Sequence, residues 1–82
     1  MDDVEALKTF VEFICCRLVD YPNKVSVSVK EDEKVVALQI TCEKTDVGKI
    51  VGKSGKTIAA IRALVSGAGG RLGRKALVEV LD

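Results

Sequence analysis

The first part of the chain repeats apolar residues at spacings of three and four positions. This periodicity predicts an amphipathic helix over residues 3–20 with one stripe facing the core. The chain then reaches Pro22, which cannot continue a helix and restricts the residue before it. The predicted core stripe consists of Val4, Leu7, Val11, Ile14 and Leu18. Three more apolar residues widen the stripe, so the helix is either deeply buried or shared with another chain: Phe10, Phe13 and Val19.

Three later segments have a period of two or are rich in β-branched residues, as strands are. Residues 25–30 alternate valines with polar residues, and residues 35–41 are again rich in valine and isoleucine. The charged turn at 31–34 joins them, so a hairpin is the simplest interpretation. Alternation over residues 76–81 predicts a third strand.

Two helices are predicted between the second and third strands. A short helix over residues 47–51 has Thr45 or Asp46 as its N-cap. It is interrupted by a four-residue glycine loop at 52–55, after which a longer helix begins.

This longer helix is predicted over residues 56–66, because Ile58, Ile61 and Val65 fall on one of its faces. We expect Gly67 to end it and the glycine-rich segment 69–73 to form a loop. The resulting order is α-β-β-α-α-β. It predicts a single α+β domain over residues 1–82, with a three-stranded sheet and the helices packed on one of its faces.

The composition narrows the possible functions. With 82 residues, 48% of them hydrophobic and 30% charged, the chain can form one modest core but no large catalytic cleft. It contains no histidine, which removes the usual general base and the commonest metal ligand. We therefore expect no enzymatic activity and no cofactor.

The cysteines and the N-terminus indicate a reducing, cytoplasmic environment. Cys15, Cys16 and Cys42 form neither a C-x-x-C pair nor an even set, and we interpret them as buried small apolar residues. The first residues are acidic rather than basic, and no apolar run approaches the roughly eighteen residues of a membrane span.

Positive charge is concentrated in the middle of the chain. Residues 1–43 carry five basic and nine acidic side chains, whereas residues 44–75 carry eight basic side chains and the single acid Asp46. We therefore expect an anionic ligand at residues 44–75. The basic residues there are Lys44, Lys49, Lys53, Lys56, Arg62, Arg71, Arg74 and Lys75.

The glycine loop Gly52-Lys53-Ser54-Gly55 is the motif most suited to bind that anion. Its two glycines allow positive φ and a close approach of a ligand to the backbone. The helix that follows points its first amides outward, which favours a negative group. Lys49 and Lys56 flank the loop and add positive charge.

The segment from Ile50 to Ile58 resembles the signature of KH domains, in which apolar residues flank a G-x-x-G loop. With the element order it resembles type II KH domains, and in particular the KhpA family of small bacterial KH proteins. The resemblance implies that the loop clamps about four nucleotides of single-stranded RNA while neighbouring aliphatic surface receives the bases. The clamp residues it implies are Gly52, Lys53, Ser54 and Gly55. To these we add the flanking Lys49 and Lys56 as positive charges, and we expect the bases to rest on aliphatic surface from Ile50, Val51, Ile58 and the second strand. Arg62 on the longer helix either lies beside the RNA path or faces solvent.

The resemblance also implies a role and partners. KhpA-like proteins are probable RNA chaperones or post-transcriptional regulators with weak sequence specificity, connected with cell-wall synthesis and cell shape. They pair with themselves or with a larger, multidomain KH protein. The chain offers two faces for such pairing, the wide stripe of the first helix and the small face formed by Ala59, Ala60 and Ala63.

Two other interpretations compete with RNA binding. A nucleotide-binding P-loop would need glycine where Val47 or Ile50 stands, and a short helix rather than a strand precedes the loop. Alternatively, the chain is a protein–protein interaction module in which the loop is only a tight turn and the lysines are ordinary solvated charges.

Some assignments stay open at this stage. Arg71, Arg74 and Lys75 either contact phosphates or interact with the end of the preceding helix. The aromatic residues Phe10, Phe13 and Tyr21 have spacings suited to packing, so base recognition by aromatic stacking is not expected.

Overall fold

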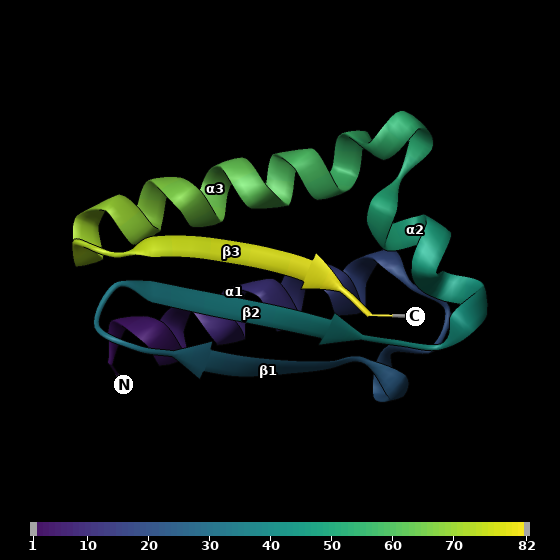
Figure 1. Cartoon of the computed structure of the whole chain (residues 1–82). Helices are drawn as coiled ribbons and strands as arrows, with labels where there is room; N and C mark the ends of the chain where they lie inside the picture. The colour runs from purple at the N-terminus through teal and green to yellow at the C-terminus, as the bar shows by residue number, and fades with distance from the viewer. Residues whose placement is uncertain (1, 82) are drawn as a thin grey trace.

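The computed structural model describes residues 2–81 and has the predicted order of helices and strands (Figure 1). Within these residues no helix combines the length and apolar character needed to cross a bilayer. Single turns of 3-10 helix lie at Pro22–Lys24, Lys44–Asp46 and Lys53–Gly55. The main elements are α1 (Asp3–Leu18), β1 (Ser26–Glu31), β2 (Val35–Thr41), α2 (Val47–Val51), α3 (Lys56–Leu72) and β3 (Lys75–Val80).

The sheet has the order β1-β2-β3 and is covered on one face only. β1 and β2 form the predicted antiparallel hairpin, whereas β3 runs parallel to β2. The buried residues of β2 are Val36, Leu38 and Ile40, which alternate along the strand, and Leu38 and Ile40 belong to the core cluster with residues of α1 and α3. Figure 1 shows the sheet from its uncovered face, with α1 behind it and α3 along β3.

Helix α1 is shorter than predicted and presents a rotated face to the core. Its N-cap is Asp2, whose carboxylate accepts the backbone N–H of Glu5 at 2.8 Å. It ends at Leu18 because the backbone N–H groups of Asp20 and Tyr21 donate to the carboxylate of Asp46 and not to carbonyls of the helix. Cys15 completes the buried stripe, whereas Leu18, predicted in the core, is exposed and Ile14 is only partly buried.

Helix α3 differs most from the sequence prediction. It continues past Gly67 for five more residues to Leu72 and ends at Gly73, which has a left-handed conformation with φ of 71°. The N–H groups of Gly73 and Arg74 bind the carbonyls of Gly70 and Gly69 at 3.2 Å, the two bonds of a Schellman motif. The predicted terminator and the predicted loop at 69–73 were therefore wrong.

Packing explains why the helix continues through Gly69. A Cβ atom on Gly69 would lie 2.6 Å from Cβ of Ala76 and 3.1 Å from the carbonyl oxygen of Arg74. The missing side chain thus lets α3 approach the start of β3, and this contact outweighs the low helix propensity of glycine.

The burial predicted for the three cysteines is right for one of them, and of the two alternatives for the wide stripe of α1 the exposure of its aromatic residues excludes deep burial. Cys15 is fully buried, and desolvation raises the pKa of its thiol to about 11. Cys16 and Cys42 are partly exposed. Phe10, Phe13 and Tyr21 have exposed fractions of 39%, 61% and 51%, so they do not pack in the core of this chain.

Candidate nucleic-acid interface

The loop at residues 52–55 projects where α2 turns into α3, at a corner of the molecule away from the sheet (Figure 1). Its backbone turns through three residues with positive φ: Gly52 (80°), Ser54 (56°) and Gly55 (73°). Hydrogen bonds within the segment hold this turn. The N–H of Gly52 binds the carbonyl of Gly48 at 2.8 Å, and that of Gly55 binds the carbonyl of Gly52 at 3.1 Å.

Gly52 is required by close packing as well as by its conformation. A Cβ at this position would overlap Oγ1 of Thr57 and lie 2.6 Å from Cβ of that residue. A Cβ on Gly55 would meet nothing within 4 Å, so there only the positive φ favours glycine. The first glycine therefore lets the first turn of α3 pack against the loop.

Two isoleucines anchor the loop from inside the core. Ile50 on α2 is fully buried, and Ile58 on α3 is 5% exposed. The prediction that bases rest on these two side chains conflicts with their burial, because neither offers surface to a ligand. Val51 is partly exposed and is the residue of the three with apolar surface beside the loop.

Positive charge at the loop comes from Lys53 and Lys56. Both are exposed, and neither takes part in an ion pair among residues 2–81. Helix α3 begins directly behind them without a side-chain cap, so its positive dipole end faces the same region. Exposed lysines, a helix N-terminus and a tight glycine turn together suit a phosphate backbone.

Lys49 does not add free charge to this region. Its Nζ lies 3.2 Å from Oδ2 of Asp20 and 3.5 Å from Oδ1 of Asp46. The hydrogen bond and charge of Asp20, with those of Asp46, raise the pKa of the lysine. It therefore neutralises carboxylates instead of presenting an unpaired cation as predicted.

Asp46 has a structural role that the sequence did not indicate. It was a candidate N-cap of α2, but its side chain makes no such bond. Instead its fully buried carboxylate accepts the backbone N–H groups of Asp20 at 3.2 Å and Tyr21 at 3.0 Å. It thus ties the end of α1 to the start of α2, which carries the glycine loop. Only a tertiary structure reveals this contact, because 25 residues separate Tyr21 from Asp46.

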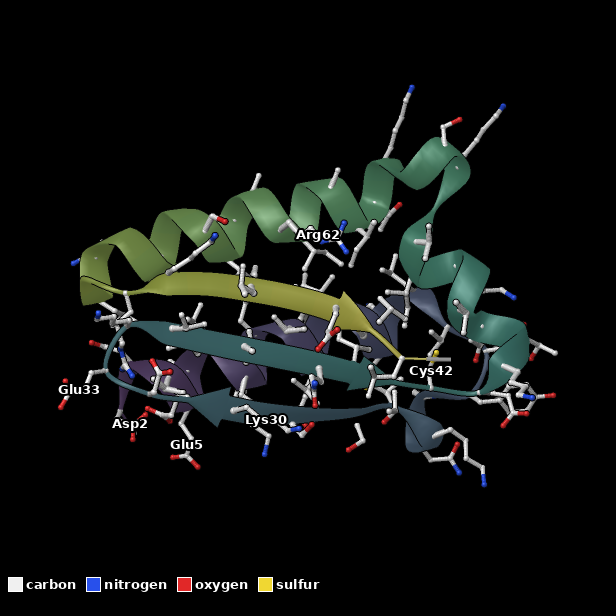
Figure 2. The ribbon with its side chains drawn as sticks, viewed as in Figure 1. Asp2, Glu5, Lys30, Glu33, Cys42 and Arg62 are labelled. Atoms are coloured by element: carbon white, nitrogen blue, oxygen red, sulfur yellow. The ribbon has the colours of Figure 1, made fainter. Side chains whose placement is uncertain are left out.

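Arg62 is held between α3 and β3, as Figure 2 shows. Its Nε donates a hydrogen bond to the carbonyl oxygen of Val78 at 3.1 Å. The guanidinium is thereby placed along the edge of β3, one and a half turns from the first residue of α3. The sequence prediction that Arg62 lies beside an RNA path agrees with this position but is not tested by it.

Three further basic residues, Arg71, Arg74 and Lys75, lie at the opposite end of α3, and Lys44 lies in the 3-10 turn before α2. The helix has 17 residues and is therefore about 25 Å long. Arg74 pairs with Glu31 at 2.9 Å and also binds the carbonyl oxygen of Asp32. Arg71 and Lys75 stand near it, so the single basic region expected from the sequence is divided between two ends of the molecule.

Comparison with known proteins places the sequence in one family. The family model described as "KhpA/KhpB, KH domain" matches residues 8–80. The RNA-binding protein KhpA of Aquifex aeolicus is 33% identical over 96% of this chain and 100% of its own length. The proteins of the same name from Bacillus subtilis and Borreliella burgdorferi are 36% and 38% identical, over 93% and 88% of this chain and 94% and 88% of theirs. No solved structure matches significantly.

Proposed function

The chain belongs to the KhpA/KhpB family of KH domains, and on this premise we propose that it binds single-stranded RNA through the loop at residues 52–55. This family consists of RNA-binding domains and not of enzymes. The proposal agrees with the name of the relatives, RNA-binding protein KhpA.

One observation carries the proposal. The glycine loop combines three features that suit binding of a nucleic-acid backbone. It turns through residues with positive φ, buried isoleucines anchor it, and its exposed lysines have no ion-pair partners among residues 2–81. A protein-interaction module could use an exposed turn, but it would not need an anion site at a helix N-terminus.

In the proposed mechanism the loop binds the sugar-phosphate backbone. Lys53 and Lys56 attract the phosphates, Ser54 donates a hydrogen bond through its hydroxyl, and the first amides of α3 face the negative charge. Bases lie on the surface around Val51 and toward Arg62. Sequence preference is weak because phosphate contacts carry no base information and, among residues 2–81, no aromatic side chain belongs to the loop or its flanking helices α2 and α3.

The finer role rests on the family resemblance. We propose that the protein acts in the cytoplasm as an RNA chaperone or post-transcriptional regulator, since weak and sequence-tolerant binding suits transient contact with many RNAs. The connection with cell-wall synthesis and cell shape stays a prediction from that resemblance.

We also propose that the protein works as a dimer, with a second copy or with a larger KH protein. Phe10 and Phe13 leave an apolar face on α1, and the alanine face of α3 is exposed beside Leu64, of which 59% is accessible. Two linked RNA sites bind more tightly than one because the second contact becomes intramolecular.

The test is a titration of labelled single-stranded RNA with the wild type and with the double variant Lys53→Asp, Ser54→Asp. We expect affinity to fall at least about a hundredfold, because a cation is replaced by two carboxylates at the phosphate site. The fold should persist, since aspartate tolerates the left-handed conformation of Ser54 and both residues are exposed. Wild-type affinity should also decrease steeply with salt.

The matched control is the double variant Asn23→Asp, Lys24→Asp. It makes the same change in net charge on exposed residues of the turn before β1. If both variants lost RNA affinity equally, overall charge would explain the loss, and this result would contradict RNA binding at the loop. A folded wild type that binds no RNA would instead support the interaction module.

A further inference from the structure

Strand β1 has an unpaired outer edge. It is an end strand of the sheet, and among residues 2–81 it pairs with β2 alone. The N–H of Asp32 binds the carbonyl of Val35 at 2.9 Å, so this pair points its hydrogen-bonding groups toward β2. Antiparallel pairs alternate between bonded and non-bonded, which directs the N–H and C=O groups of Val27, Val29 and Glu31 outward. Among residues 2–81 no hydrogen bond uses these groups.

A groove of about 590 Å³ runs beside this edge, between β1 and the first two turns of α1. Val29 on the strand is the partly exposed apolar residue of its lining, whereas Val27 and Val4 are buried beneath it. The side chains of a strand alternate between the two faces of its sheet, so an additional strand beside β1 would point every second side chain toward this groove. The free backbone groups and the apolar lining therefore suit the same ligand, an extended peptide.

The charges around the groove select the kind of peptide. Asp2 and Glu5 contribute two carboxylates against the single ammonium group of Lys8, whereas the carboxylate of Glu31 is paired with Arg74 at 2.9 Å. In Figure 2 the side chains of Asp2 and Glu5 extend beyond the outer edge of β1. This acidic rim repels RNA, and pairing β1 with β1 of a second copy would bring two acidic rims together.

We propose that the groove between α1 and β1, called here the α1–β1 groove, binds an extended basic segment of a partner protein as a fourth strand of the sheet. The segment hydrogen-bonds to the outward groups of β1, places its apolar side chains in the groove and sets its basic side chains against the carboxylates. β1 and β3 are opposite edges of the sheet, and α3 lies along β3. The proposal therefore does not rest on RNA binding at the loop.

The probe is a fluorescein-labelled peptide of sequence KVKVKVK, followed by fluorescence anisotropy at low salt. Its affinity should fall about tenfold with Glu5→Lys, which reverses a charge on the rim, and about tenfold with Val29→Pro, which removes one outward donor. An edge strand accepts proline where the N–H is not part of the ladder, so the second variant should fold. Glu33→Lys, an exposed charge reversal outside the groove, should change affinity less than about twofold.

Two control peptides separate strand addition from simple charge attraction. The sequence EVEVEVE should not bind, and KVKVKVK with alternate N-methylated amides should bind at least about tenfold more weakly because it cannot pair with the edge. A second measurement uses the wild type alone: the peptide should slow hydrogen exchange at the amides of Val27, Val29 and Glu31. This measurement decides the question even if Val29→Pro does not fold.

Several results would overturn the proposal. These are no saturable binding at about millimolar protein, equal binding by folded Val29→Pro, or slowed exchange confined to other parts of the molecule. Self-association that Val29→Pro abolishes would identify a second copy as the occupant, and protection of the same amides by RNA would identify a nucleic acid. A variant Lys53→Asp, Ser54→Asp that loses RNA but keeps the peptide would separate this surface from the proposed RNA site.

Discussion

At the scale of single residues, Gly52 shows how the loop depends on one missing atom. We predict that Gly52→Ala lowers the free energy of unfolding by about 2 kcal/mol or more, because the new Cβ meets Thr57 and the positive φ of 80° is strained for alanine. Urea unfolding measures the change. Gly48→Ala is the control: its Cβ would have open space and no positive φ, so we expect a gain of about 0.5–1 kcal/mol. Equal effects of the two substitutions would contradict the packing argument.

Asp46 predicts how stability depends on pH. Burial by itself raises the pKa of its carboxyl, but the backbone N–H groups of Asp20 and Tyr21 and the charge of Lys49 lower it below the ordinary value of 3.8. A lowered pKa in the folded state means that the carboxylate stabilises the fold above about pH 4 and loses this effect as pH falls further.

The corresponding variant is Asp46→Asn. Its thermal midpoint should be lower than that of the wild type at pH 7, and the difference should narrow below pH 4 as the wild-type carboxylate becomes protonated. Asp20→Asn is the control, because its exposed ion pair with Lys49 contributes little while its backbone N–H is unchanged. A constant difference between Asp46→Asn and the wild type at every pH would contradict the role of charge.

At the scale of elements, the last turns of α3 are stabilised by contact with β3 rather than by local propensity. We predict that Gly69→Ala destabilises the protein by about 1–3 kcal/mol, because its Cβ would overlap Ala76. Gly70→Ala, one residue later, would place its Cβ in open space and should stabilise the helix by about 0.5–1 kcal/mol. Chemical denaturation measures the free energy of unfolding of both variants. A stabilised Gly69→Ala would show that α3 does not need to approach β3 so closely.

The hairpin of β1 and β2 illustrates the opposite case, in which local sequence suffices. Asp32 accepts the N–H groups of Lys34 and Val35 at 2.7 and 2.8 Å, so a single side chain organises the turn. These two hydrogen bonds, of which the one from the N–H of Lys34 has the larger effect, lower the pKa of Asp32. Alternating apolar residues on either side then set which face of the hairpin is buried.

At the scale of the whole molecule, the exposed apolar faces predict self-association. We expect sedimentation equilibrium to show a dimer that dissociates on dilution, and either Phe13→Glu on α1 or Ala63→Glu on α3 to shift it to monomer. The variant that does so should also bind RNA more weakly, because avidity is lost. Lys24→Glu, an exposed charge reversal on neither face, is the control. A wild type that is monomeric at every concentration would contradict this prediction.

The sequence by itself determined the local features of this protein. The periodicity of apolar residues identified the kinds of element and their order, and the chemistry of glycine and lysine located the loop at residues 52–55. These features depend on neighbours within a few positions, so a single sequence contains them. The burial of Ile50 and Ile58 on either side of the loop follows from the same pattern, although their burial argues against the base contact first assigned to them.

Only the tertiary structure decided features that depend on residues far apart in the chain. The extension of α3 depends on Ala76, the pairing of Lys49 depends on Asp20, and the position of Arg62 depends on Val78. The position of β3 beside β2 leaves β1 with a free edge, and no local pattern records that choice. Long-range packing outweighs local preference at these points, because the free energy of a close contact or a buried carboxylate exceeds the small differences in propensity that a sequence reveals.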